Sequence, residues 1–396
     1  MLPRRLDTPV LILLVFAALV VLSYSILRGA TYSNDFKNPY RVARVFWQTG
    51  ALDIRSEPRY PPTVRVLLAP LAALPIAVAA TVWGVVSLAA IAAVPGLLAR
   101  LSAIPVRAQV LPWLAVLTFV ADALVLGQSD PINLFLVVAG LVLAQGERPV
   151  LGAGLIGLAG MLKVLPAVFW AVLVARRRLR AAVIGAFLTA VVGGALLTGF
   201  AGRDAGLDSV LEWYAGLRET EGPWGLVEQR NSLRENNESL PVVLARTFGD
   251  LDPGLARNAV PLARLPLRTI WAAWLAIIAL MTLTWAGCAW RARRVAPERG
   301  WLGMFALTAV LMLALTPIAW PHYFLWLLPA ALFLGHRPRL LLAVAILGQL
   351  GMMLPLLRGL GCHMVLALAL FAMVARDLLV ATRATSRDKV RNVAEP

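Results

Sequence analysis

The amino-acid sequence predicts an all-α integral membrane protein, folded as one multi-pass helical bundle over residues 1–396. Apolar blocks of about 18 to 25 residues recur along the chain, and each is long enough to cross roughly 30 Å of hydrocarbon as a helix. The composition is 60% hydrophobic and only 15% charged, which excludes an ordinary soluble domain. The charged residues concentrate between the blocks, as the loops of a membrane protein require.

The blocks predict about 12 crossings, counted from the sequence. Pro9 to Leu27 lacks a small-x-small cleavage site, so we expect a first span and not a signal peptide. Residues 62–75 suit a half-inserted segment, and residues 151–174 hold Lys163 and Pro166 in their middle. That pattern predicts one kinked helix or two short helices that meet at Lys163. The other blocks are 76–101, 110–126, 131–144, 181–200, 267–290, 302–315, 322–334, 340–357 and 364–380.

The first polar stretch, residues 28–62, predicts an extracytoplasmic catalytic loop. Asn38 followed by Pro39 is typical of a helix start, because Asn is a good N-cap and Pro fits the first helical position. The sequence therefore predicts an interfacial amphipathic helix from Pro39 to about Thr49. Arg41, Arg44 and Gln48 share one of its faces, and Val42, Val45 and Phe46 lie toward another.

The second polar stretch, residues 201–265, predicts a long extracytoplasmic loop. Loops of this length are usually functional or disordered, and the aromatic residues Trp213 and Trp224 argue against disorder. These tryptophans suit stacking on a sugar face, and they equally suit anchoring of the loop to the bilayer.

Arginine clusters set the predicted orientation. Three basic regions mark the cytoplasmic side: residues 176–180, the group Arg291, Arg293, Arg294 and Arg299, and the tail from Arg383. This places the N-terminus inside and both polar loops outside. The opening loop then breaks the positive-inside trend, because it carries Arg28, Lys37, Arg41, Arg44, Arg55, Arg59 and Arg65. We interpret that excess of positive charge as a sign of an anionic ligand.

The net charge of +16 would suggest nucleic acid in a soluble chain, but here it lies in loops beside anionic lipid headgroups. We therefore expect membrane lipids and no nucleic acid as partners. Cys288 and Cys362 fall in or beside apolar blocks and define neither a disulfide framework nor a metal site. The sequence contains no ligand-spaced Cys/His cluster and no glycine-rich phosphate loop.

Asp35 is the first candidate for chemistry. If Asn38 caps the helix, Asp35 is left without that structural task. A carboxylate can take a proton from an attacking hydroxyl, and arginine binds phosphate oxygens in bidentate fashion. The alternative is that the arginines bind lipid headgroups and Asp35 is a solvated neighbour.

Two charged residues, Asp122 and Lys163, lie inside apolar blocks, where such residues pair or line a cavity. We expect either an ion pair between neighbouring helices or contact with substrate. Asp130 precedes Pro131 and is expected to be an N-cap, which leaves Gln128 without a structural explanation. His322 begins a predicted span on the outer face, where it suits phosphate binding or proton transfer, although a lone histidine there is often merely tolerated.

Six motifs in order resemble glycosyltransferase family 87, whose members are membrane mannosyltransferases of the GT-C fold. The resemblance covers nearly the whole chain. The motifs are N-D-F (34–36), Y-P-P and L-L-A-P-L-A-A-L-P (60–62 and 67–75), G-Q (127–128), G-L-x-x-L-A-G-M-L-K-V-L-P (154–166), N-E-S-L (237–240) and T-P-I-A-W-P-H-Y (316–323). The chain departs from the family where Glu238 replaces the usual Gln and where Tyr323 stands at a position that is often a second His.

The resemblance implies a GT-C-type bundle in the plasma membrane that transfers a hexose, most often mannose, with inversion. The donor is a polyprenyl-phosphate sugar and the acceptor a lipid-linked or envelope glycan on the extracytoplasmic face. It assigns Asp35 as general base, with His322 beside the leaving phosphate. The expected substrate-binding residues are Arg41, Arg44, Arg59, Tyr60, Gln128, Lys163 and Asn237. Because arginine can neutralise one lipid phosphate, we expect no metal and no cofactor.

Two other classes compete with this interpretation. A lipid transporter or flippase would also explain Asp122 and Lys163, but it predicts internal repeats that the sequence does not show. A structural subunit of an envelope assembly would leave Asp35 unexplained.

Overall fold

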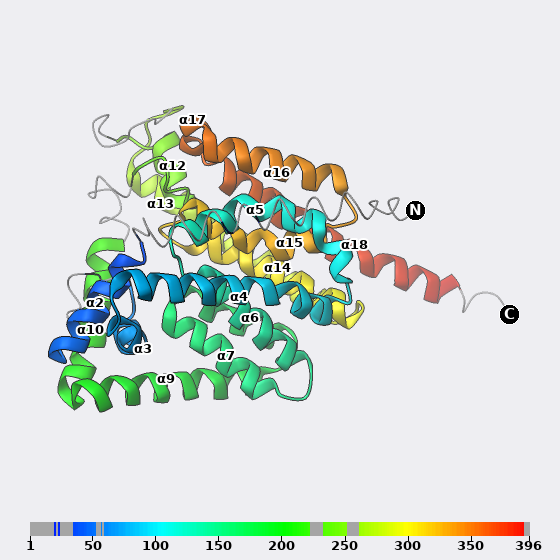
Figure 1. Ribbon diagram of the computed structural model, residues 1–396. Helices are drawn as coiled ribbons and strands as arrows, with labels where there is room; N and C mark the ends of the chain where they lie inside the picture. The colour runs from blue at the N-terminus through cyan, green and yellow to red at the C-terminus, as the bar shows by residue number, and fades with distance from the viewer. Residues whose placement is uncertain are drawn as a thin grey trace.

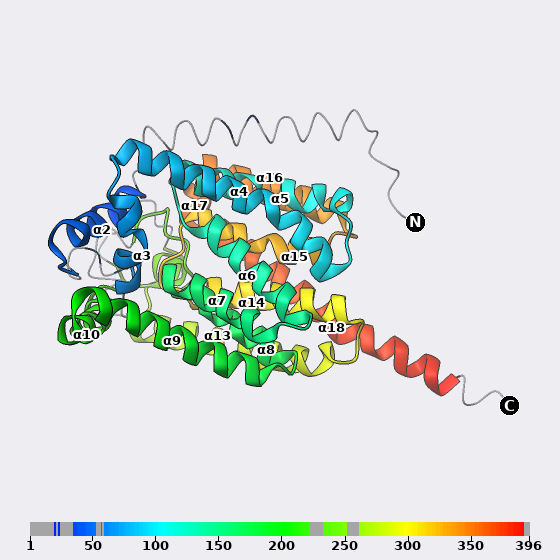
Figure 2. The same ribbon diagram turned by 60° about the horizontal axis from the view of Figure 1, so that its bottom comes forward.

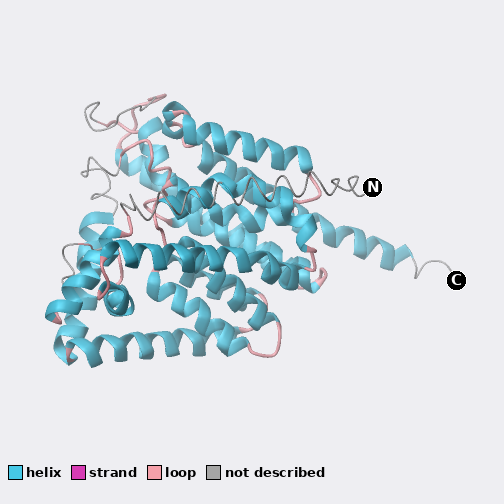
Figure 3. Cartoon of the chain, viewed as in Figure 1, coloured by secondary structure: helices cyan, strands magenta, loops and turns pink. Residues whose placement is uncertain are grey.

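The computed structural model describes residues 35–52, 57, 59–221, 233–251 and 261–391, with Val20 and Ser23, and side chains for all of these except 220–221 and 381–391. Within these residues the regular structure is helical, and one isolated bridge joins Gly249 to Leu265 (Figure 3). The predicted first span, residues 9–27, lies outside the described residues apart from Val20 and Ser23. Trp224 lies outside them as well.

Among the described residues, six helical segments have the length and composition to cross a membrane. They are α4 (Ile76–Ser102), η1 with α5 (Val106–Gln109 and Val110–Val125), α9 (Leu179–Ala201), α13 (Leu267–Ala292), α14 (Pro297–Leu315) and the first part of α18 (Cys362–Arg391). Other apolar segments are shorter: α3 (Pro62–Ala72), α6 (Asp130–Gln145), α7 (Pro149–Leu162), η2 with α8 (Leu165–Phe169 and Trp170–Ala175), η3 with α15 (Pro321–Leu327 and Leu328–Phe333) and α16 (Pro338–Met353). The multi-pass helical bundle is confirmed, with six helices of spanning length where the sequence predicted about 12 crossings.

Breaks between short helices explain much of this difference. Helix α7 ends at Leu162, Lys163 is extended with φ −157° and ψ 123°, and η2 begins two residues later. Of the two predicted alternatives for residues 151–174, the pair of short helices meeting at Lys163 is therefore confirmed. A second break separates α14 from η3, where residues 316–320 have no helical structure. Both breaks bring polar side chains into the bundle, where irregular backbone is tolerated because protein surrounds it.

Helix α14 forms the centre of the bundle. All of its residues from 300 to 314 are buried, and α13, α15 and α18 pack against it. In contrast, large apolar side chains such as Val85 on α4, Phe187 on α9 and Leu283 on α13 are exposed. An apolar outer surface of this kind is what contact with lipid requires, and it identifies the chain as a membrane protein.

Glycines allow α6 and α7 to approach closely. A Cβ atom added at Gly152 of α7 would collide with the carbonyl oxygen of Gly140 on α6, so these two positions exclude larger side chains. Close approach through small residues is a common way to pack helices in a membrane. It holds α7, and therefore the break at Lys163, against the start of α6.

The two arginine-rich loops meet at one end of the bundle. Arg176, after α8, donates to the carbonyl oxygen of Ala292 over 2.6 Å, and Arg293 donates to that of Ala175 over 3.4 Å. Helices α2 (Lys37–Thr49), α3, α10 (Arg203–Glu221) and α12 (Leu240–Phe248) gather at the opposite end (Figures 1 and 2). This arrangement agrees with the relative placement predicted from the arginines, and the side on which each end lies stays a prediction.

Helix α2 begins two residues earlier than predicted, at Lys37. Asn38 is therefore inside the first turn, and the prediction that it caps the helix is wrong. The amphipathic pattern is nevertheless present, because Val42 and Phe46 are buried while Arg41 is exposed. The buried face packs on α3, whose Arg65 is fully buried and donates to the carbonyl oxygens of Tyr60 and Glu57.

The predicted long loop is partly helical. Helix α10 continues beyond α9 and packs on it, and α12 follows at Leu240. Trp213 of α10 packs against a small apolar cluster that includes Leu197, consistent with the order expected from its aromatic content. The residues between 222 and 232 and between 252 and 260 lie outside the described part of the chain.

Candidate active site

Asp35 and Gln128 are brought together although 93 residues separate them. Gln128 donates from Nε2 to Asp35 Oδ2 over 2.6 Å. Gln128 follows the turn at Gly127, where φ is 66°, and the carbonyl of Gly127 accepts a hydrogen bond from Trp83 over 2.9 Å. This turn fixes the position of Gln128. Its side chain, which had no structural explanation in the sequence, is the hydrogen-bond partner of Asp35.

Lys163 pairs with Asp130. The distance from Lys163 Nζ to Asp130 Oδ2 is 2.7 Å, and Trp326 donates to Asp130 Oδ1 over 3.1 Å. Of the two alternatives for Lys163, an ion pair is therefore present, but its partner is Asp130 and not Asp122. The N-cap prediction for Asp130 is also wrong, because Ser129 precedes α6 as its N-cap residue and the Asp130 carboxylate, 2% exposed, turns into the bundle.

Two tyrosines lie near this ion pair and Asp35. The Lys163 ammonium lies 3.7 Å from the centroid of the Tyr323 ring, a cation–π contact. Burial raises the pKa of Tyr60 above its ordinary value, and the negative charge of Asp35 and the neighbouring Tyr323, Glu57 and Asp130 raise it further. Tyr60 therefore stays a neutral phenol that can donate a hydrogen bond at this site.

His322 lies beside the same group. Its side chain is 1% exposed, its ring centroid is 4.8 Å from that of Tyr323, and its Nδ1 is 3.7 Å from Asp122 Oδ2. Neither ring nitrogen has a hydrogen-bond partner in the structure. A buried imidazole whose nitrogens are unsatisfied is costly unless a ligand completes it. The structure also brings Asp122 close to His322, although 200 residues separate them in the sequence.

Two of the three predicted arginines, Arg41 and Arg44, contact other groups of the chain. Arg41 is exposed and forms an ion pair with Glu57 at 3.3 Å. Arg44 donates to the carbonyl oxygens of Ala72 and Ala73, at 2.6 and 3.2 Å, and so caps the end of α3. Arg59 is exposed and immediately precedes Tyr60 in the chain. Of the three arginines, it is therefore the nearest in sequence to a member of the polar group around Asp35.

Asn237 lies in a segment that binds the backbone before His322. Its Oδ1 accepts from the backbone N–H of Ala319 over 3.0 Å, and Glu238 donates its own N–H to the Ala319 carbonyl over 2.8 Å. The N-E-S-L motif therefore packs on the T-P-I-A-W-P-H-Y motif. Substrate binding by Asn237 stays a prediction, and the contacts in the structure are with the chain itself.

The structure thus assembles Asp35, Tyr60, Gln128, Lys163 and His322 of the predicted residues and adds Asp130, Tyr323 and Trp326. The added residues come from two helices, α6 and η3, which are far apart in the chain, so no single local motif could have identified them together. Chemically, the group offers one hydrogen-bonded carboxylate that can accept a proton, and an ammonium and an imidazole that can stabilise a phosphate.

Comparison with known proteins gives a consistent result. The family model described as glycosyltransferase family 87 matches residues 59–317, a range that contains Tyr60, Gln128, Lys163 and Asn237 but neither Asp35 nor His322. No solved structure is significantly similar to this chain.

Two curated relatives are named polyprenol-phosphate-mannose-dependent alpha-(1-2)-phosphatidylinositol pentamannoside mannosyltransferases. The one from Mycolicibacterium smegmatis is 28% identical over 281 residues, which cover 70% of this chain and 61% of the relative. The one from Mycobacterium tuberculosis is 26% identical over 284 residues, covering 70% and 58%. This chain therefore spans about three fifths of the length of these relatives. Because the family model matches well over half of its residues, the chain belongs to glycosyltransferase family 87.

Proposed function

We propose that the protein is an inverting membrane mannosyltransferase that uses a polyprenyl-phosphate sugar as donor and a glycolipid as acceptor. The observation that carries the proposal is the Asp35 carboxylate, hydrogen-bonded to Gln128, in one polar group with Tyr60, Lys163 and His322. Family membership and the donor named for both relatives support it.

In the proposed reaction, an acceptor hydroxyl attacks C1 of the sugar while Asp35 takes its proton. The bond between C1 and the phosphate oxygen breaks from the opposite face, so the anomeric configuration inverts, and the prenyl phosphate leaves with the bonding electrons. Gln128 holds the carboxylate of Asp35 in place through its 2.6 Å hydrogen bond. Fixing a base in this way lowers the entropic cost of reaching the transition state.

Lys163 and His322 are the proposed ligands of the leaving phosphate. Lys163 is fixed by Asp130 and by the Tyr323 ring, so its charge needs no reorganisation when negative charge develops on the phosphate. His322 has two unsatisfied ring nitrogens in a buried position, where a phosphate oxygen would satisfy one of them. Arg59, which is exposed and precedes Tyr60 in the chain, is the third proposed ligand.

The proposed location is the plasma membrane, with the α2, α3, α10 and α12 end outside. This places the reaction on the extracytoplasmic face, where lipid-linked donors and acceptors share one leaflet. The arginine-rich loops then face anionic lipid on the inside.

The decisive experiment uses the purified protein in vesicles. Polyprenyl-phosphate mannose, polyprenyl-phosphate glucose and a nucleotide sugar are offered with phosphatidylinositol mannosides as acceptor, and products are followed by mass. We expect mannose transfer from the lipid phosphate. Transfer from the nucleotide sugar alone would contradict the proposal.

A further inference from the structure

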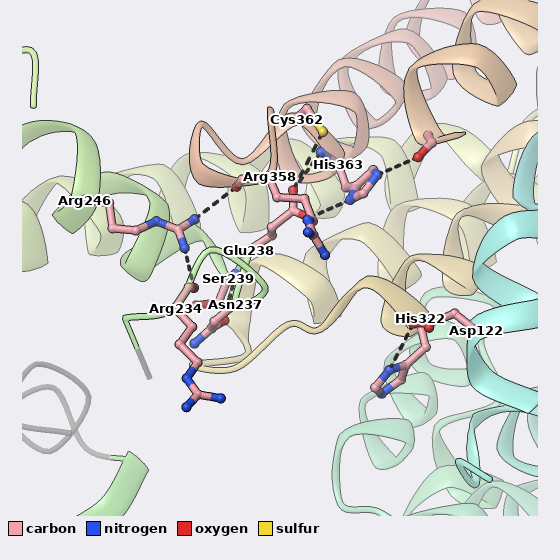
Figure 4. A network of polar contacts seen from close by, with 11 residues as sticks. Asp122, Arg234, Asn237, Glu238, Ser239, Arg246, His322, Arg358, Cys362 and His363 are labelled. Carbon is pink, nitrogen blue, oxygen red and sulfur yellow. Dashed lines mark hydrogen bonds and ion pairs between the residues drawn. The ribbon is translucent and has the colours of Figure 1, made fainter. Parts of the chain in front are cut away.

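Glu238, a residue outside the catalytic group, joins the last helix to the segment that carries His322. Its carboxylate is fully buried and lies 2.6 Å from His363 Nδ1 through Oε1 (Figure 4). Oε2 accepts from the backbone N–H of His363 over 3.1 Å. The Glu238 carboxylate therefore accepts a hydrogen bond from a free backbone N–H in the first turn of α18, although Glu238 lies in another part of the chain.

The surroundings favour a charged pair. The N-terminus of α18 and the cation Arg246 both stabilise a carboxylate anion at Glu238. His363 Nε2 lies 3.0 Å from the carbonyl oxygen of Gly348, a group that can only accept. With an anion on one side and a carbonyl on the other, both ring nitrogens must donate, and only the imidazolium has two N–H groups.

Neighbouring residues close the site around this pair. A Cβ atom added at Gly351 of α16 would collide with Cys362 Sγ and His363 Nε2, so α16 presses directly on the imidazole. Arg246 is 1% exposed and donates to the carbonyl oxygens of Arg234 and Arg358, which ties the same segment to α17 (Pro355–Gly359). Burial lowers the pKa of Arg246 to about 10, so it remains a cation at neutral pH.

The backbone of Glu238 and its neighbours holds the extended segment before η3. Glu238 N–H donates to the Ala319 carbonyl over 2.8 Å, and Asn237 Oδ1 accepts from the Ala319 N–H over 3.0 Å. Ser239 Oγ donates to the carbonyl of Pro317 over 2.7 Å. The N–H and the carbonyl of Ala319 are therefore both hydrogen-bonded, three residues before His322.

We propose that Glu238 and His363 form a buried ion pair whose role is to position the His322 segment for sugar transfer. This inference rests on the proposed function, because it assigns His322 a place at the leaving phosphate. Both residues are positioning residues, since their contacts are with helix α18, helix α16 and the segment before η3. A displacement of about 1 Å at a reacting group can cost on the order of 10²-fold in rate.

The test compares Glu238→Gln, His363→Asn and the double variant. Each single change leaves one buried charge without its partner, whereas two amides can bond to each other without burying a charge. We expect each single variant to lose about 10²-fold in kcat per folded molecule, and the double variant to recover most of that loss. Melting temperature in detergent should recover in the double variant as well.

Glu235→Gln is the matched control. It removes the same charge from the same segment, three residues before the carboxylate that contacts His363. We expect this variant to keep kcat within about threefold of the unmodified protein, because an exposed or half-exposed charge contributes little.

Each other outcome has a definite meaning. Losses that multiply in the double variant would show that the two residues act independently, which overturns the pair. Single variants that melt earlier but keep normal kcat would leave a structural pair and overturn its positioning role. A stoichiometric metal in the purified protein that Glu238→Gln removes would replace the pair by a metal site with Cys362. If no lipid-phosphate donor is used at all, the proposed function fails, and recovery of melting temperature in the double variant still decides whether the pair exists.

Discussion

Lys163 and Asp130 form a salt bridge of 2.7 Å between the break after α7 and the start of α6. The carboxylate is 2% exposed and the ammonium 15%, so the pair is almost completely removed from solvent. The bond to Trp326 and the Tyr323 ring complete its surroundings. An ion pair in such a place is expensive to break by removing one partner only.

Replacement of Lys163 by Met should therefore leave Asp130 as an uncompensated buried charge and destabilise the fold by about 3–5 kcal/mol. Asp130→Asn should cost a similar amount. The double variant should cost less than the sum of the two single changes. Melting temperature in detergent measures this. Asp122→Asn is the control, since Asp122 lies near His322 and not Lys163, and coupling of Asp122 to Lys163 in the same assay would contradict the observed pairing.

The sequence predicted the features that depend on local pattern. Apolar block length predicted the bundle, and a lysine followed by Pro166 predicted the break at Lys163, because proline in the interior of a helix removes a backbone hydrogen bond and favours a kink or a break. The sequence left Gln128 without a structural explanation and named it as a substrate-binding residue, and its contact with Asp35 became visible only in the structure.

The errors concern partners that only the tertiary structure reveals. Ser129-Asp130-Pro131 has the local pattern of a helix start, and that pattern concealed a carboxylate that pairs with a lysine 33 residues away. Asn38 likewise has the composition of a cap, but the chain is already helical at Lys37, and the buried Phe36 is the N-cap residue. Glu238 and His363 are 125 residues apart and carried no signal beyond the departure at Glu238.

Variants of Arg44 and Arg41 should distinguish a structural arginine from a ligand-binding one. Arg44 donates two hydrogen bonds to the end of α3, so Arg44→Met should lower the free energy of unfolding by about 1.5–3 kcal/mol. Arg41 is largely exposed, and Arg41→Met should change stability by less than about 1 kcal/mol. Thermal unfolding and the donor KM are measured for both. A large rise in donor KM for Arg41→Met would instead make Arg41 a phosphate ligand.

The orientation of the bundle can be tested with two introduced cysteines. Gln48 is exposed on α2, and Glu147 is exposed in the turn between α6 and α7 near the arginine-rich end. On intact cells we expect an impermeant thiol reagent to label Gln48→Cys and not Glu147→Cys. The unmodified protein, with Cys288 buried and Cys362 half-buried, sets the background. The reverse labelling pattern would overturn the proposed topology.

Tyr60 should act as a hydrogen-bond donor and not as a base. Its pKa is raised above the ordinary value of 10, chiefly by burial and then by Asp35, so the phenol is protonated across the whole working range of pH. Tyr60→Phe should lower the transfer rate about tenfold, as loss of one hydrogen bond predicts, without moving the pH optimum. The control is Tyr40→Phe, whose hydroxyl donates to the Leu74 carbonyl and should affect stability only. An alkaline limb of the pH–rate profile that disappears in Tyr60→Phe would show that Tyr60 ionises.

Asp35→Asn is the central prediction. The substitution keeps the size of the side chain and an oxygen that can accept from Gln128, but it removes the basic carboxylate. A general base typically contributes ~10² to 10⁴ in rate, so turnover should fall by that factor. Folding should change little, because helix α2 begins at Lys37 without a side-chain cap at its N-cap residue.

Donor affinity separates the two halves of the proposed mechanism. Lys163 and His322, and not Asp35, are expected to hold the phosphate, so donor affinity should survive in Asp35→Asn while it weakens in a His322→Ala variant. Glu57→Gln is the matched control from the same loop, since Glu57 forms its ion pair with Arg41 at 3.3 Å. Turnover, donor affinity and membrane expression are compared in parallel. Near-normal turnover of Asp35→Asn together with a large loss in Glu57→Gln would transfer the role of base to Glu57.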